Sequence, residues 1–195
     1  LSTYNGEKFL KDFISSIETQ TYKDWRLIIR DDGSSDSTKK ILAEAQKIKP
    51  DKFILLEDNV GNIGACKSFF TLLQNSDADY IMFADQDDVW LPSKIEKTLQ
   101  KMVQVEQKYG RGIPILIHTD LKIVDRELNL ISKSFWKYQK RNPNIKTLNY
   151  LLVQNNVVGC TMMINRALKK YINVIPEKAI MHDWWITLIS SAFGI

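Results

Sequence analysis

Two aspartates one residue apart, Asp85 and Asp87, are the first candidates for chemistry in this sequence. They follow the apolar run 81–84 directly, and apolar residues resume at Val89 and Trp90. Two carboxylates at this spacing can place one oxygen on a hard cation and another on its bound water or on a sugar hydroxyl. Mg²⁺ and Mn²⁺ accept so few protein ligands because substrate phosphate oxygens complete the coordination shell. A solvated, aspartate-rich loop would explain the bare tripeptide equally well, so the motif gains its weight from its position after a buried strand.

Two further polar segments follow apolar runs earlier in the chain. In the segment 31–36, Asp32 can accept a hydrogen bond from the N3–H of a uracil or thymine ring, while nearby backbone amides support ribose and phosphate. In the segment 2–6, Tyr4 could stack on a base, and Ser2 lies in the same candidate donor-binding segment. Each has a purely structural alternative, a helix-capping loop for the first and a strand-turn-helix junction for the second.

Alternating strands and helices must position these segments. Apolar periodicity predicts helices behind the polar segments, over residues 7–19, 38–48, 65–74 and 92–109. Short apolar runs predict strands over residues 25–30, 53–56 and 80–84. This alternation implies an α/β fold with a mainly parallel central sheet and helices on both faces. Ligands of such sheets bind at the carboxyl ends of the strands, where both acidic segments lie.

The pattern is less regular beyond residue 110. The sequence predicts, in order, a strand over 113–117, an irregular basic segment over 121–145, a short helix over 147–153, a strand over 161–164 and a helix over 183–193. No internal repeat or linker divides the chain. We therefore expect a single domain over residues 1–195, in which the half 1–115 binds a nucleotide and the half 116–195 is variable.

Composition excludes several other classes. A content of 44% hydrophobic and 26% charged residues over 195 residues predicts an ordinary globular domain. Two distant cysteines fit neither a thiolate metal cluster nor a disulfide scaffold, and they favour a reducing compartment. No apolar run reaches the roughly 20 residues of a membrane span, and the net charge of +4 favours anionic partners only weakly. Both ends read as truncated, because the first residues resemble the end of a strand.

Four segments occur in a recognisable order: STYNGEKFL, SSIETQTYKDWRLIIRDDGSSDST, NVGNIGACKSF and YIMFADQDDVWLPSKI. As a set they resemble the inverting, nucleotide-sugar-dependent glycosyltransferases of family 2, which have the GT-A fold. The resemblance covers nearly the whole chain and implies one catalytic domain with a nucleotide-sugar-binding half and an acceptor-binding half. The later segments NNVVGCTMMINRAL and HDWWITLISSAFG resemble the bacterial rhamnosyltransferase branch, which builds cell-surface polysaccharides.

The resemblance implies roles for individual residues. Tyr4 and Asp32 would flank a pyrimidine base, with Asp32 accepting from its imide. Asp85 and Asp87 would hold Mg²⁺ or Mn²⁺, Asp87 as the direct ligand and Asp85 nearer the ribose or the metal's water. Asp183 matches the position of the catalytic base. Many relatives carry a Glu-Asp pair there, whereas this chain has His182 before Asp183, so we assign no acid role to the histidine.

The chemistry of sugar transfer supports the same assignment of Asp183. A diphosphate leaves as charge builds on it, which a divalent cation stabilises as a Lewis acid, and the acceptor hydroxyl needs a base on the opposite face. Direct displacement inverts the anomeric centre. Met181, Trp184 and Trp185 would limit hydration of Asp183 and raise its pKa. The residues alone favour a simple helix cap at Asp183, and the resemblance reverses that preference.

The acceptor side has three candidates. Trp184 and Trp185 open an apolar helix, so we expect at least one of them in the core and the other against a sugar ring. Asn156 precedes the strand 161–164 and could line the acceptor site, although a structural role is the simpler account for most of its neighbours.

These observations together predict a metal-dependent inverting glycosyltransferase. We expect a UDP- or dTDP-sugar as the donor, dTDP-rhamnose as the first guess, a saccharide or lipid-linked glycan as the acceptor and no nucleic-acid partner. The basic and aromatic segment 133–141 favours a peripheral contact of this cytoplasmic protein with the inner face of the cell membrane. The alternatives are a catalytically inactive module that binds nucleotide-sugars or glycans and, less favoured for want of a glycine-rich phosphate cradle, another metal-dependent phosphate enzyme. The oligomeric state stays open.

Overall fold

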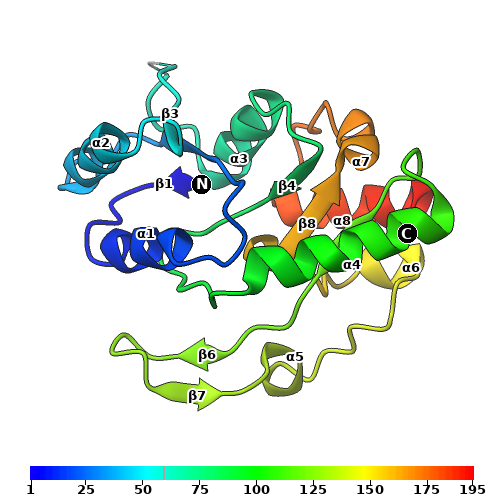
Figure 1. Cartoon of the computed structure of the whole chain (residues 1–195). Coiled ribbons are helices and arrows are strands. Elements are labelled where there is room, and N and C mark those ends of the chain that lie inside the picture. Colours follow the sequence, from blue (N-terminus) through cyan, green and yellow to red (C-terminus); the bar gives the residue numbers. More distant parts are fainter. Residues whose placement is uncertain (59) are drawn as a thin grey trace.

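The computed structural model describes residues 1–58 and 60–195 (Figure 1). The first four strands each lead into a helix, in the order β1 (Ser2–Thr3), α1 (Leu10–Glu18), β2 (Leu27–Asp31), α2 (Thr38–Ile48), β3 (Phe53–Leu55), α3 (Ala65–Gln74), β4 (Tyr80–Met82) and α4 (Lys94–Tyr109). The second half contains β5 (Leu116–His118), β6 (Ile123–Val124), β7 (Leu130–Ser132), α5 (Phe135–Tyr138), α6 (Leu148–Leu151), the 3₁₀ turn η1 (Gly159–Thr161), β8 (Met162–Asn165), α7 (Arg166–Tyr171) and α8 (His182–Phe193). The predicted alternation of strands and helices is confirmed for the first half.

The described strands form two three-stranded sheets and one hairpin. In the first sheet, β1, β2 and β3 are parallel, with Thr3 opposite Asp31 and Ile28 opposite Ile54. The second sheet has the order β4-β8-β5, and β8 is antiparallel to both neighbours, so that Ile164 lies opposite Ile81 on one side and Leu116 on the other. The parallel pairing predicted from the first half is present, and the antiparallel β8 in the middle of the second sheet is a feature that the sequence did not predict.

Helices cover both faces of these sheets, as predicted. Alternate residues of β8 enter different cores, because side chains of a strand point to opposite faces. Met162 and Ile164 pack into a cluster with residues of α3, α7 and α8. Met163 packs on the other face with Met102 of α4 and with Ile115. Figure 1 accordingly shows α4 and α8 on opposite sides of β8.

Some predicted boundaries shift for local reasons. The predicted strand over 113–117 is observed at Leu116–His118, because Pro114 has no backbone N–H to add to a sheet. The segment 121–145, predicted to be irregular, contains the hairpin of β6 and β7 and the short helix α5. These elements lie apart from the main body, beneath α4 in Figure 1. None of the helices described is long and apolar enough to cross a bilayer.

Candidate active site

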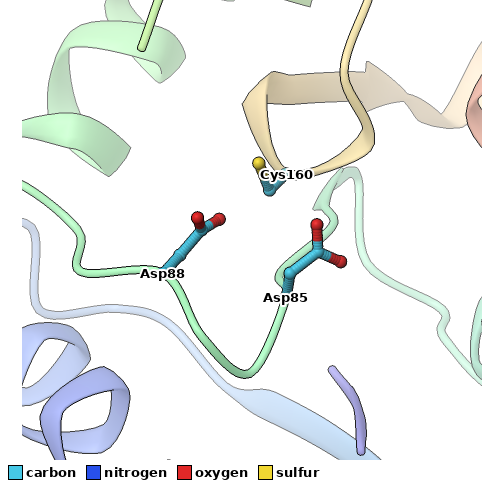
Figure 2. A group of neighbouring side chains, drawn as sticks. All are labelled: Asp85, Asp88 and Cys160. Carbon is cyan, nitrogen blue, oxygen red and sulfur yellow. The ribbon is translucent and has the colours of Figure 1, made fainter. Parts of the chain in front are cut away.

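The loop after β4 and the turn before β8 bring three reactive side chains together. Asp85 and Asp88 come from the loop, and Cys160 comes from η1 (Figure 2). One carboxylate oxygen of each aspartate and the Cys160 sulfur all lie within 4.8 Å of one another. Asp87, by contrast, is exposed to solvent. The predicted aspartate pair therefore points in two directions, with Asp85 toward the protein interior and Asp87 toward the open side of the loop.

The carboxylates of this cluster fit a divalent cation, whereas the thiol does not. Burial raises the pKa of the Cys160 thiol, and the charges of Asp88 and Asp85 raise it further. A thiol that stays protonated is a poor metal ligand. Carboxylate oxygens are the hard donors that Mg²⁺ and Mn²⁺ prefer. The sequence offers no reason to place Asp88 beside Cys160, because the two residues come from segments far apart in the chain.

Electrostatic repulsion concentrates at Asp85. Burial raises the pKa of Asp85 to about 6, and the charges of Asp88, Asp87 and Asp183 contribute in the same direction. The carboxylate at the start of α8 therefore lies within electrostatic range of the loop after β4. This convergence of a distant aspartate on the acidic loop is the arrangement that a two-sided transfer site requires.

Lys94, in the first turn of α4, partly balances these charges. Its ammonium group donates to the Cys160 carbonyl at 2.7 Å and lies 4.0 Å from the centre of the Trp90 ring. Burial lowers the pKa of Lys94, while the charges of Asp88 and Asp85 act against that shift. A lysine in the first turn is unfavourable to the helix dipole. That mismatch is the signal by which Lys94 could have been identified from the sequence.

Asp32 is buried at the end of β2, next to the site. Its carboxylate forms an ion pair with the buried Arg30 and accepts from the backbone N–H groups of Ile63 at 2.8 Å and Gly64 at 2.9 Å. Arg30 also pairs with Asp58. Asp32 thus holds the loop between β3 and α3 against β2. Its role as acceptor of a base imide stays a prediction.

Ser2 is the first residue of β1, and Tyr4 directly follows the strand. The Ser2 hydroxyl donates to the Ser68 hydroxyl at 2.7 Å, and Ser68 accepts in turn from Arg30. The Tyr4 side chain is 51% exposed, so its ring is accessible to a ligand. The side-chain amide of Gln86 pairs with the Tyr4 backbone. Gln86, the middle residue of the Asp-x-Asp motif, therefore connects the two loops, a link that the sequence did not reveal.

Asp183 lies in the first turn of α8 and is held by backbone groups. One carboxylate oxygen accepts from the Gly159 N–H at 3.1 Å, and the other accepts from the N–H of Trp184 at 2.6 Å. Burial nevertheless raises the pKa of Asp183. A carboxylate that is fixed in place and raised in pKa suits a general base better than a freely hydrated one.

The preceding residue, His182, is a neutral packing residue. Its ring stacks on Phe69 with 4.0 Å between ring centres and lies 5.3 Å from the ring of Phe83. Burial lowers the pKa of His182 to about 3. The imidazole is therefore uncharged near neutral pH and adds no positive charge beside Asp183.

Of the three acceptor-side candidates, Trp184 and Trp185 both line one apolar groove, and Asn156 does not. Trp184 donates from its indole N–H to the Leu151 carbonyl at 2.6 Å and lines this groove beside α8. Trp185 packs partly buried against the core of the second sheet. Asn156 is only 2% exposed and donates to the Asn142 carbonyl at 3.1 Å. Its side chain holds the 142–145 segment in place, so it is not on an acceptor surface.

A groove runs from the start of α3 to the segment before α8. It has a volume of about 440 Å³ and is lined by residues 63–67 on one side and by residues 175–177 and 179–181 on the other. Burial raises the pKa of Cys66, a residue of this groove, and the charge of Asp183 raises it further. The groove therefore lies beside the carboxylate that would act as base.

Comparison with known proteins shows one family. The sequence model described as glycosyl transferase family 2 matches residues 1–172. Among curated proteins, the chain is 30% identical over 169 residues to the UDP-Glc:alpha-D-GlcNAc-diphosphoundecaprenol beta-1,3-glucosyltransferase WfgD of Escherichia coli, covering 86% of this chain and 59% of WfgD. It is 36% identical over 106 residues to the dTDP-rhamnosyl transferase RfbG of Shigella flexneri, covering 53% of this chain and 37% of RfbG.

Solved structures agree on the fold. S. aureus TarS 1–349 in complex with UDP-GlcNAc superimposes with a TM-score of 0.65 at 20% identity, over 97% of this chain and 51% of that one. The mannosyltransferase PcManGT of Pyrobaculum calidifontis, in complex with GDP-Man and Mn²⁺, gives a TM-score of 0.67 at 14% identity, over 95% of this chain and 48% of that one. The chain thus spans about half the length of these enzymes and has their GT-A fold.

Proposed function

The chain belongs to glycosyl transferase family 2, and on that premise we propose that it is a metal-dependent inverting glycosyltransferase. The donor is a UDP- or dTDP-sugar, with rhamnose as the first candidate, and the acceptor is a glycan of a cell-surface polysaccharide. One observation carries the proposal: Asp183 of α8 accepts from the Gly159 N–H at 3.1 Å, and the sulfur of the next residue, Cys160, lies within 4.8 Å of an Asp85 carboxylate oxygen after β4. Transfer needs acidic groups on both sides of the reacting carbon.

The relatives support a nucleotide-diphosphate donor. RfbG is a dTDP-rhamnosyl transferase by name, WfgD uses UDP-Glc by name, and TarS has been solved with UDP-GlcNAc. The exposed ring of Tyr4 at the end of β1 is accessible for stacking on a pyrimidine. Because these relatives differ in sugar, the rhamnose assignment depends on the partial match to RfbG.

Asp87 and Asp85 are the residues that would hold the cation, with Asp88 beside them. PcManGT, a structural neighbour, contains Mn²⁺. When bound, Mg²⁺ or Mn²⁺ would neutralise the diphosphate leaving group. The protein's own contribution is the loop geometry: Asp87 is exposed toward the open side, while Asp85 and Asp88 are held inward near Lys94.

Asp183 serves as the general base in this proposal. It takes the proton of the acceptor hydroxyl while the new carbon–oxygen bond forms and the diphosphate departs from the opposite face. The backbone N–H groups of Gly159 and Trp184 keep the carboxylate oriented, and neutral His182 beside it does not compete as a charged partner. A single displacement of this kind inverts the anomeric centre.

A nucleotide titration tests the proposal. We expect UDP or dTDP to bind more tightly in the presence of Mn²⁺, by roughly tenfold or more. Asp183→Asn should retain nucleotide binding and lose sugar transfer by about 10²- to 10⁴-fold, whereas Asp51→Asn, at an exposed surface carboxylate, should change neither. Absence of binding, or binding that ignores the cation, would refute the metal-dependent assignment. Binding without transfer by the intact protein across donors would support an inactive nucleotide-sugar-binding module instead.

We also propose a peripheral contact with the inner face of the cell membrane. The hairpin exposes apolar side chains, with Leu128, Leu130 and Ile131 each more than half exposed. Lysines 133, 137 and 140 follow in and around α5, all of them exposed. Apolar side chains flanked by cations bind anionic lipid surfaces. The lipid-linked acceptor in the name of WfgD is consistent with an enzyme that works at such a surface.

A further inference from the structure

Gln86 connects two loops that the proposed mechanism uses separately. Its side-chain carbonyl accepts from the Tyr4 N–H at 3.0 Å, and its side-chain NH₂ donates to the Tyr4 carbonyl at 2.9 Å. Tyr4 follows β1, whereas Gln86 lies between Asp85 and Asp87 after β4. The amide therefore pairs with both backbone groups of one residue, as a neighbouring strand would do.

This double pairing requires a glutamine. A glutamate could accept from the Tyr4 N–H but has no N–H to donate to the Tyr4 carbonyl. An aspartate or asparagine is shorter by one methylene, and a hydrogen bond weakens steeply once its distance exceeds the normal range. Gln86 is therefore the side chain that this gap between the loops accommodates.

Gly6 provides a second, independent observation. A Cβ atom on Gly6 would lie 2.2 Å from the Gln86 Oε1 atom and 2.5 Å from its Cδ atom. Gly6 is not among the glycines with positive φ, so its backbone conformation alone does not demand glycine. The missing side chain at this position makes room for the Gln86 amide.

The loop after β1 is anchored on its other side to the start of α2. The Asn5 N–H donates to the Ser34 hydroxyl at 2.9 Å, and the Gly6 N–H donates to the Thr38 hydroxyl at 2.8 Å. With Gln86 on the remaining side, the backbone at Tyr4 is fixed relative to both acidic segments. The position of the exposed Tyr4 ring relative to Asp85 and Asp87 is thereby set by Gln86.

We propose that Gln86 is a positioning residue that sets the spacing between the base-stacking ring of Tyr4 and the carboxylates at the diphosphate. This inference rests on the proposed function. A nucleoside diphosphate can contact both ends of the site at once only when that spacing matches the ligand, and the second contact then forms at a high effective concentration. A ligand without a base, such as pyrophosphate, uses only one end.

A double-mutant cycle tests this role. Gln86→Ala, Gly6→Ala and the double variant are titrated calorimetrically with UDP, dTDP and pyrophosphate, each with Mn²⁺. We expect each single variant to bind the nucleotides about tenfold more weakly, because the two ends of the site are no longer preorganised at the spacing of the ligand, and to bind pyrophosphate like the wild type. Because alanine at residue 6 acts by displacing the amide, the double variant should be no weaker than Gln86→Ala.

Matched controls and fold checks make each outcome decisive. Gln104→Ala, on the exposed face of α4, and Gly112→Ala, where an added Cβ meets no atom within 4 Å, should bind as the wild type. Wild-type nucleotide affinity in Gln86→Ala, an equal loss for pyrophosphate, or additive losses in the double variant would overturn the inference. If Gln86→Ala does not fold, Gln86→Met, which has a similar length, no charge and no amide group, replaces it with the same expectation. Failure of the wild type to bind either nucleotide would instead refute the proposed function.

Discussion

Asp85 is a destabilising residue in the metal-free protein. Its pKa in the fold is about 6 against an ordinary 3.8, because it is buried among other carboxylates. A carboxyl group with a raised pKa stabilises the fold most below pH 3.8, and this contribution is lost as the pH rises through 6. Its ionisation at neutral pH therefore acts against folding. In the proposed function a bound cation would offset this cost, because the ionised carboxylate is the form that binds metal.

We expect Asp85→Asn to raise the free energy of unfolding at pH 8 by about 1–3 kcal/mol, since asparagine carries no charge to bury. The gain should shrink toward zero as the pH falls to about 3, below the ordinary pKa of 3.8, where Asp85 is protonated in both the folded and the unfolded states. Thermal melts in chelator across this pH range measure the difference. In the same melts, added Mn²⁺ should raise the melting temperature of the wild type and leave that of Asp85→Asn unchanged. A gain that is independent of pH would contradict the argument.

The elements around β2 depend on a buried ion pair. Arg30 is 1% exposed and joins Asp32, Asp58 and the loop before α3. Asp32→Asn should lower the free energy of unfolding by about 2–4 kcal/mol, because the buried Arg30 loses its more deeply buried partner, which solvent screens least. Asp58→Asn, whose side chain is 23% exposed, should cost about 1 kcal/mol or less. Urea unfolding compares the two.

This comparison also separates two roles of Asp32. If Asp32 only organises the loop, both variants should lose nucleotide affinity in proportion to their lost stability. A loss of affinity in Asp32→Asn far beyond that seen in Asp58→Asn would support the predicted contact with the base. Equal stability of the two variants would contradict the packing argument.

The junction between η1 and α8 has no room for a side chain at residue 159. A Cβ atom on Gly159 would lie 2.9 Å from the His182 Nε2 atom, and His182 is confined between Phe69 and Phe83. Gly159→Ala should therefore shift the start of α8, lower stability by about 1–3 kcal/mol and slow sugar transfer through Asp183. Removing the ring in a Gly159→Ala/His182→Ala variant should restore part of the transfer rate, which a steady-state assay measures. If the transfer rate of the double variant does not recover, the clash with His182 is not the cause of the loss in Gly159→Ala.

The sequence predicted the parts of the site that are local in the chain. Asp85 and Asp87 were identifiable because polar residues follow an apolar run. The contact between Lys94 and Cys160 was not predictable, because it joins residues 66 positions apart. The direction of β8 was equally inaccessible, since all four of its residues are buried and a strand buried on both faces shows no alternation of apolar and polar residues. The antiparallel direction of β8 depends on its pairing with β4 and β5, which come much earlier in the chain.

Across the whole molecule, the hairpin of β6 and β7 carries a group of exposed apolar side chains, Leu128, Leu130 and Ile131. We expect the protein to bind vesicles that contain anionic lipid and to dissociate as salt is raised, because cations lie beside its apolar residues. Ile131→Glu should reduce the bound fraction about fivefold or more. Ile48→Glu, on an even more exposed isoleucine of α2, should not. Vesicle co-flotation measures both, and equal effects of the two substitutions would argue against a hairpin contact.

The central place of β8 has a consequence for how the chain is made. During synthesis, β4 and β5 emerge well before the strand that pairs with both of them. Until residues 162–165 arrive, each of the two strands presents an unpaired edge on the side where β8 will pair, and such edges recruit other chains. We expect any version shortened before Met162 to aggregate, whereas versions that retain β8 and α7 remain dispersed in light scattering. The strand β8 therefore protects β4 and β5 against mispairing with other chains.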